Sequence, residues 1–122
     1  MHDPEPEPGR LLPITPAVFH ILLALADGER HGYGIMQEVA RCTEGKARLG
    51  PGTLYRSIKK MLNDGLIEES GERPDPELDD ERRRYYRLTN FGCSVAAAET
   101  ERLEALVGVA RATGLLRGPK PA

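Results

Sequence analysis

The basic residues between positions 46 and 60 form the part of this chain best suited to chemistry with a charged partner. This segment has no acidic residue and five basic ones, Lys46, Arg48, Arg56, Lys59 and Lys60. A lysine attracts phosphate as a point charge, whereas an arginine can form two parallel hydrogen bonds with a phosphate or with a guanine edge. The segment therefore indicates contact with nucleic acid.

The net charge of the whole chain, -2, conceals this basic segment. Residues 1–10 carry a net charge of -2 and residues 71–81 carry -5, which leaves +5 on the rest of the chain. Because the distribution of charge governs association more than its total does, an acidic average does not exclude DNA as a partner.

No arrangement of residues in the sequence indicates catalysis or metal binding. Cys42 and Cys93 fit no metal or redox spacing, so we expect two reduced thiols. The histidines have no partners at metal spacing, and no carboxylate pair, phosphate loop or Ser/His/Asp set stands in a suitable context. The N-terminus does not resemble a signal peptide, and the apolar stretch at residues 18–26 is too short to span a bilayer. We expect a cytoplasmic protein without enzymatic activity, cofactor, metal or membrane partner.

Three helices must position the basic segment. Residues 1–13 alternate proline with glutamate and predict a disordered leader. Thr15 and Pro16 then start a helix that ends near residue 28, because a hydroxyl caps free amides and proline loses no hydrogen bond at the first position. A second helix should cover residues 33–42.

The third helix is predicted over residues 51–64, with Gly65 as its C-terminal cap. At about 100° per residue, one third of its circumference is apolar, with Leu54, Ile58, Met61 and Leu62. The opposite side carries Tyr55, Arg56, Lys59, Lys60 and Asn63. Three helices of this length with tight turns predict a helix-turn-helix core.

A two-stranded hairpin is predicted after the third helix. The segments LIEES (residues 66–70) and RYYRL (residues 84–88) are short and rich in aliphatic or aromatic residues, and a charged stretch with two prolines separates them. Such a ribbon is marginal alone, so it should lean on the helices through Leu66, Tyr86 and Leu88. The predicted fold class is mainly α with a small two-stranded β-wing.

A last helix should begin after a cap at Thr89 and end near residue 115. Its apolar residues recur at threes and fours, at Phe91, Val95, Ala98, Leu103, Leu106 and Ala110. Its polar positions are Glu99, Glu101, Glu104 and Arg111. This helix either folds back on its own domain or forms a dimer seam, and the small core favours the seam.

Three strings carry a resemblance to a known family. They are HGYGIMQEV at residues 31–39, PGTLYRSIKKMLNDGLI at residues 51–67 and YYRLTNFG at residues 85–92. In this order they resemble the PadR family of bacterial transcriptional regulators over residues 16–115. The resemblance implies a winged helix-turn-helix that dimerises and mostly represses. The short final helix resembles compact members, which dimerise through one C-terminal helix and part of the first.

The third helix of such a fold enters the major groove of DNA. We therefore expect DNA contacts from Thr53, Tyr55, Arg56, Lys59 and Lys60. Arg56 is the candidate for base contact, and the lysines and Thr53 suit phosphates. For Tyr55 the alternative is packing against the turn.

The wing departs from the family pattern, in which wings are often short and rich in glycine and arginine. Here the hairpin tip carries six acidic residues, which phosphate would repel: Glu72, Asp75, Glu77, Asp79, Asp80 and Glu81. At its base, the run Arg82, Arg83 and Arg84 either reaches the DNA backbone or only balances the adjacent acids.

The sequence thus predicts a homodimeric repressor on a near-palindromic operator, with two recognition helices about 34 Å apart. We expect a leader over residues 1–13, a DNA-binding domain over 14–88, a dimerisation helix over 89–116 and a tail over 117–122. The dimerisation residues are expected to be Phe19, Leu103, Leu106 and Ala110. Phe19, Leu103 and Leu106 also line a candidate pocket for a hydrophobic small-molecule effector that releases DNA. The alternative is a winged helix that binds a protein partner and no DNA.

Overall fold

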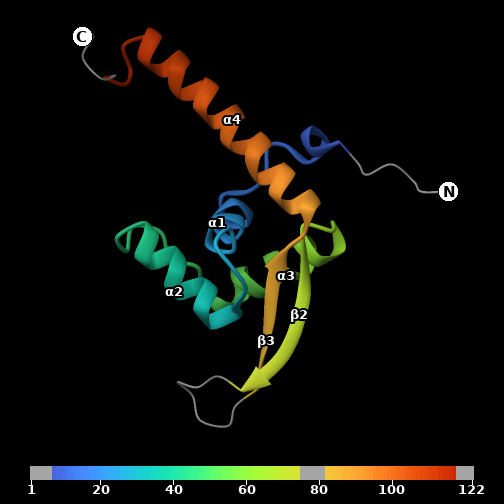
Figure 1. The fold of residues 1–122 in the computed structure, drawn as a ribbon. Helices are drawn as coiled ribbons and strands as arrows, with labels where there is room; N and C mark the ends of the chain where they lie inside the picture. The colour runs from blue at the N-terminus through green and yellow to red at the C-terminus, as the bar shows by residue number, and fades with distance from the viewer. Residues whose placement is uncertain (1–6, 75–81, 118–122) are drawn as a thin grey trace, which may run out of the picture.

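The computed structural model of the chain describes residues 7–74 and 82–117. Figure 1 shows the helices α1, α2 and α3 grouped together, with the β2–β3 hairpin extending from them on one side and α4 on the other. The elements are η1 (Pro8–Leu11), α1 (Pro16–Ala24), β1 (Arg30–His31), α2 (Gly32–Cys42), α3 (Pro51–Asn63), β2 (Ile67–Pro74), β3 (Arg82–Leu88) and α4 (Asn90–Ala112). The predicted fold class, a mainly α winged helix-turn-helix with a long last helix, is confirmed.

Side-chain caps fix where three of the helices begin. The Thr15 hydroxyl accepts a hydrogen bond from the Val18 amide at 3.2 Å, and the Thr89 hydroxyl accepts one from the Gly92 amide at 2.9 Å. At the start of α2, Nδ1 of His31 accepts from the Gly34 amide at 2.9 Å. Each cap satisfies an amide that the helix itself leaves unpaired. The helices α1 and α4 end about three residues earlier than predicted, because single turns follow each of them.

The core draws side chains from every helix from α1 to α4 and from the sheet. Its fully buried members include Ile21, Leu22, Ile35, Leu54, Met61, Leu66 and Val95. Tyr86 is buried and Leu88 packs against the core, as predicted for the hairpin. Leu62 was predicted to be buried and is 38% exposed. Leu62 lies about 80° around the helix from Leu54, at the edge of the apolar arc, so no neighbouring element covers it.

The sheet has a third strand, which the sequence did not reveal. β1 pairs antiparallel with β3, with Arg30 opposite Tyr86 and His31 opposite Tyr85, so the strand order is β1-β3-β2. The predicted two-stranded wing is thus present as the β2–β3 hairpin, and β1 adds a third strand to its sheet. A two-residue strand is too short to show an alternating pattern, and its partner lies far along the chain. This pairing joins the hairpin to the start of α2.

Part of the predicted leader is folded. Pro8–Leu11 form the short helix η1, and Leu11, Leu12 and Ile14 pack against the core. The Ile14 amide donates a hydrogen bond to the Glu99 carboxylate at 3.1 Å, and Arg102 forms an ion pair with the same carboxylate. Glu99, one of the polar positions of the predicted last helix, is only 2% exposed. Its charge is tolerated there because both partners satisfy it.

The two halves of α4 differ in burial. Phe91 and Val95 lie in the core of their own domain, whereas Leu106 is 53% exposed and Val109 is 58% exposed. The apolar side of α4 therefore continues past the core, as Figure 1 shows from the length of helix extending beyond the other elements.

Candidate nucleic-acid interface

The helix α3 presents one apolar face to the core and one polar face to solvent. Leu54, Ile58 and Met61 are buried. All five α3 residues predicted to contact DNA are exposed, Thr53, Tyr55, Arg56, Lys59 and Lys60. The structure thus brings these side chains together on one side of the helix, and their contact with DNA stays a prediction.

The positive charge on this face is largely unneutralised. Among the described residues, neither Arg56 nor Lys59 has a carboxylate within 4.0 Å. Lys60 pairs with Asp64, with 3.2 Å between Nζ and Oδ2. The Arg56 guanidinium lies 3.4 Å from the Thr53 hydroxyl, which holds it near the start of α3. Such exposed cations can attract phosphate without first giving up a protein partner.

A shallow hollow of about 620 Å³ lies on the same face. Its lining is basic and polar apart from one exposed leucine, with Arg56, Lys59, Lys60, Leu62 and Asn63. Leu62 was predicted to be buried in the core but lies in this surface hollow. An apolar group such as a thymine methyl could contact it there.

Tyr55 both packs against α2 and faces solvent. Its ring lies over Gly32, with the hydroxyl oxygen 2.8 Å from the point where a Cβ atom would stand at that glycine. The side chain is nevertheless 49% exposed. Tyr55 therefore contacts the first residue of α2, and contact of its exposed part with DNA stays a prediction.

The arginines of the wing, the β2–β3 hairpin, have acidic neighbours. Nε of Arg87 lies 2.7 Å from Glu68, and Nε of Arg84 lies 3.9 Å from Glu69. Arg83 is half-buried. The Arg82 side chain lies outside the described part of the structure, as do the predicted acidic tip residues Asp75, Glu77, Asp79, Asp80 and Glu81. The described wing therefore offers less free positive charge than α3.

The loop before β1 holds one more acidic residue against the wing. The carboxylate of Glu29 accepts a hydrogen bond from the Ser70 hydroxyl at 2.7 Å and pairs with Arg73 at 2.5 Å. These two partners, the Ser70 hydrogen bond first, lower the pKa of Glu29 below its ordinary value.

The helix α2 is fixed by a buried glutamate. Nε of Arg41 donates to the Glu38 carboxylate at 3.0 Å, the Cys42 thiol donates to it at 3.2 Å, and Arg30 lies 3.4 Å from it. Chiefly through the Arg41 hydrogen bond, these neighbours lower the pKa of Glu38 to about 2. Arg30 also donates to the Ala24 carbonyl at 2.8 Å, so it joins the end of α1 to α2.

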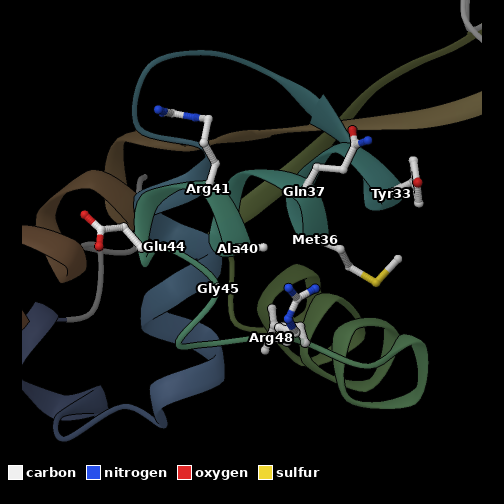
Figure 2. Close-up of a pocket in the computed structure, with 9 residues that line it drawn as sticks. Tyr33, Met36, Gln37, Ala40, Arg41, Glu44, Gly45 and Arg48 are labelled. Carbon is white, nitrogen blue, oxygen red and sulfur yellow. The ribbon is translucent and has the colours of Figure 1, made fainter.

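A groove of about 660 Å³ runs between α2 and the chain that leads into α3. Figure 2 shows Tyr33, Gln37 and Arg41 along α2, with Arg48 on the chain opposite. Met36 and Leu49 supply apolar lining, and Glu44 adds an acid to the lining. The sequence placed Arg48 in the basic segment but gave no sign of this groove, which depends on the path of the turn between two helices.

The predicted dimerisation residues lie on two helices that pack together, α1 and α4. Phe19 on α1 is half-buried, as are Leu103 and Ala110 on α4, whereas Leu106 is exposed. Their contact with a second subunit stays a prediction.

Residues 7–74 and 82–117 offer neither a metal-binding cluster nor a membrane-spanning helix. In these ranges no three His, Cys, Asp or Glu side chains are grouped to hold a metal ion. Over the same residues, no helix has both the length and the apolar character to cross a membrane. Cys42 and Cys93 are both exposed free thiols.

Comparison with known proteins points to one family. Residues 21–98 match the Transcriptional regulator PadR-like family. The chain is 40% identical over 92 residues to the Transcriptional regulator Rv3488 of Mycobacterium tuberculosis, over 75% of this chain and 77% of that protein. A transcriptional regulator from Clostridium thermocellum superposes with a TM-score of 0.65 at 25% identity, over 75% of this chain and 86% of that one. A PadR family transcription regulator from Clostridium difficile shares the fold with a TM-score of 0.68 at 24% identity, over 81% of this chain and 98% of that one.

Proposed function

Since this chain belongs to the PadR-like family of transcriptional regulators, we propose that it binds double-stranded DNA by inserting α3 into the major groove. The observation that carries this proposal is the exposed face of α3, where Arg56 and Lys59 have no carboxylate partner among the described residues. Arg56 is placed to contact a base or a phosphate, and Lys59 and Lys60 are placed for phosphates. Thr53 lies in the first turn of α3, where its hydroxyl and the free backbone amides of the helix N-terminus can donate hydrogen bonds to a phosphate.

The protein acts as a homodimer in this proposal. The second half of α4 extends beyond the core of its own domain with Leu106 and Val109 more than half exposed. A second copy would bury this apolar surface, together with Phe19, Leu103 and Ala110. A two-fold axis then places the two α3 helices about 34 Å apart, which fits a near-palindromic operator.

Repression follows when the dimer occupies a promoter, and an effector releases it. Phe19, Leu103 and Leu106 come from the two helices expected at the subunit boundary, so they are the proposed lining for a hydrophobic small molecule. Such a ligand releases DNA if it binds more tightly to the arrangement in which the two α3 helices are wrongly spaced.

The test is DNA binding by the full chain over a series of salt concentrations. The probe is the DNA upstream of the gene that encodes the protein, and the control is a fragment of equal length from inside the gene. We expect tighter binding to the upstream fragment, and a log-log salt slope of about -0.9 for each phosphate neutralised. A dimeric protein that binds neither fragment at low salt would instead support the reading as a protein-interaction module.

A further inference from the structure

Besides the β1–β3 pairing, the carboxylate of Glu29 joins the wing to the loop that precedes β1. Glu29 lies in the loop between α1 and β1, whereas both of its partners lie on β2. Its Oε2 accepts the Ser70 hydroxyl at 2.7 Å, and its Oε1 lies 2.5 Å from Nη2 of Arg73. The two oxygens of a single side chain thus hold two positions of the hairpin.

A β-bulge aims Ser70 at this carboxylate. Glu69 pairs with Tyr86 and Gly71 pairs with Tyr85, so Ser70 between them has no partner on β3. An extra residue in one strand redirects its side chain and bends the strand. Gly71 has a φ of 141°, a conformation that side chains other than glycine rarely adopt. The local sequence therefore builds the bend that turns β2 toward Glu29.

The contacts continue from Arg73 to the start of α2. The guanidinium carbon of Arg73 lies 4.0 Å from the centre of the Tyr85 ring. The rings of His31 and Tyr85 meet edge to face, with 5.3 Å between ring centres, and His31 caps α2 through the Gly34 amide. A cation over an aromatic ring and an edge-to-face ring pair are both favourable contacts. They form an unbroken series from β2 to the helix-turn-helix.

We propose that Glu29 is a positioning residue that sets the orientation of the wing relative to α3. The Glu68–Arg87 and Glu69–Arg84 pairs join the two wing strands to each other, whereas the Glu29–Arg73 pair joins the hairpin to the core. Without it the hairpin keeps its pairing within the sheet, β1 included, but β2 loses its side-chain contact with the loop before β1, so the angle of the wing is less tightly fixed. The consequence for DNA rests on the proposed function, because Arg84 can support binding by α3 only when the wing is held in place.

The first test needs no DNA and compares amide hydrogen exchange in the wild type, Glu29→Gln and Ser70→Ala. We expect both variants to exchange about three to ten times faster at residues 70–73 and at residues 30–31, with the amides of α3 unchanged. Glu68→Gln is the matched control, because it removes one carboxylate from an ion pair within the hairpin. That variant should affect only the strand ends near residues 68 and 87. Unchanged exchange at residues 70–73 in Glu29→Gln overturns the proposal.

The second test is a set of DNA affinities that pairs Glu29→Gln with Arg84→Ala or Lys59→Ala. Glu29→Gln should weaken binding about two- to fivefold, although removing a negative charge by itself favours DNA. Glu68→Gln makes the same charge change and should not weaken binding. Arg84→Ala should cost less in the Glu29→Gln background than in the wild type, whereas Lys59→Ala should cost the same in both.

Three results contradict the effect on DNA: tighter binding by Glu29→Gln, additive effects of Glu29→Gln and Arg84→Ala, or an Arg84→Ala variant that binds as the wild type does. If the wild type binds no DNA, the proposed function fails while the exchange measurement still decides whether Glu29 holds the wing.

Discussion

The ring of Tyr55 fills the space that a side chain at Gly32 would occupy, with the tyrosine oxygen 2.8 Å from that Cβ position. Gly32 is the first residue of α2, and Tyr55 belongs to the exposed face of α3. The helices α2 and α3 therefore pack closely at this point because Gly32 has no side chain.

Gly32→Ala should push Tyr55 outward and weaken DNA binding more than it weakens folding. Adding a methyl group to a packed site lowers the free energy of unfolding by about 1 kcal/mol when the neighbours can move. The half-exposed ring of Tyr55 can move toward solvent, so we expect a loss of that size. Thermal unfolding and DNA affinity measured on the same variant check this. In a Tyr55→Ala background the added methyl has room, so Gly32→Ala should then have almost no further effect. Equal effects in both backgrounds would show that the ring contact is not the cause.

Gly92→Ala should destabilise the fold strongly. A Cβ at Gly92 would lie 1.9 Å from the backbone carbonyl oxygen of Leu66, which is fixed by the start of β2 and cannot rotate away. We expect a loss of about 3 kcal/mol in the free energy of unfolding, measured by denaturant titration. Gly108→Ala is the control in the same helix, because nothing lies within 4 Å of its Cβ position. That variant should be as stable as the wild type or more so, and a similar loss in both would rule out the contact with Leu66.

The stability contributed by Glu38 should depend on pH. Its pKa is lowered to about 2 in the folded chain, chiefly by the hydrogen bond from Arg41, against an ordinary value of 4.5. A folded pKa below the unfolded one means that the contribution is fully present above about pH 4.5 and is lost as pH falls toward 2. Glu38→Gln should therefore unfold more easily than the wild type at neutral pH, by an amount that shrinks at about pH 3. A difference that is constant with pH would mean that the carboxylate charge is not what stabilises α2.

Leu106→Glu should disrupt the proposed dimer. A charge placed at this exposed apolar position would have to be buried at the seam, and an unpaired buried charge is costly. Sedimentation at several concentrations should show a monomer with helical content retained, and DNA affinity should fall at least tenfold because the two half-sites are no longer linked. Thr100→Glu, at an exposed position nearer the start of α4, is the control. A variant that remains a dimer would place the seam elsewhere.

Local patterns in the sequence were enough to predict the helices and the two faces of α3. Thr15 and Thr89 cap their helices as predicted, because capping depends only on the next few residues. The spacing of Leu54, Ile58 and Met61 likewise determined which side of α3 is buried, and so placed Arg56 and Lys59 in solvent.

Features that depend on residues far apart in the chain could not be predicted in this way. β1 exists because β3 pairs with it, and Glu99 is buried because Ile14 and Arg102 satisfy its charge. The contact between Tyr55 and Gly32 joins two of the strings that carried the family resemblance, yet nothing in either string shows that they touch. The pairing of the wing arginines with glutamates across the hairpin also required the strand register.

If the unpaired cations of α3 bind DNA phosphates, removing Lys59 must change how binding depends on salt. Affinities for the upstream fragment are measured over a salt series for the wild type, Lys59→Ala and Arg111→Ala, which removes an exposed charge at the far end of α4. We predict that Lys59→Ala lowers the magnitude of the log-log slope by about one unit and weakens binding to all sequences alike, while Arg111→Ala leaves the slope unchanged. An affinity and a slope for Lys59→Ala equal to those of the wild type would show that Lys59 does not bind a DNA phosphate.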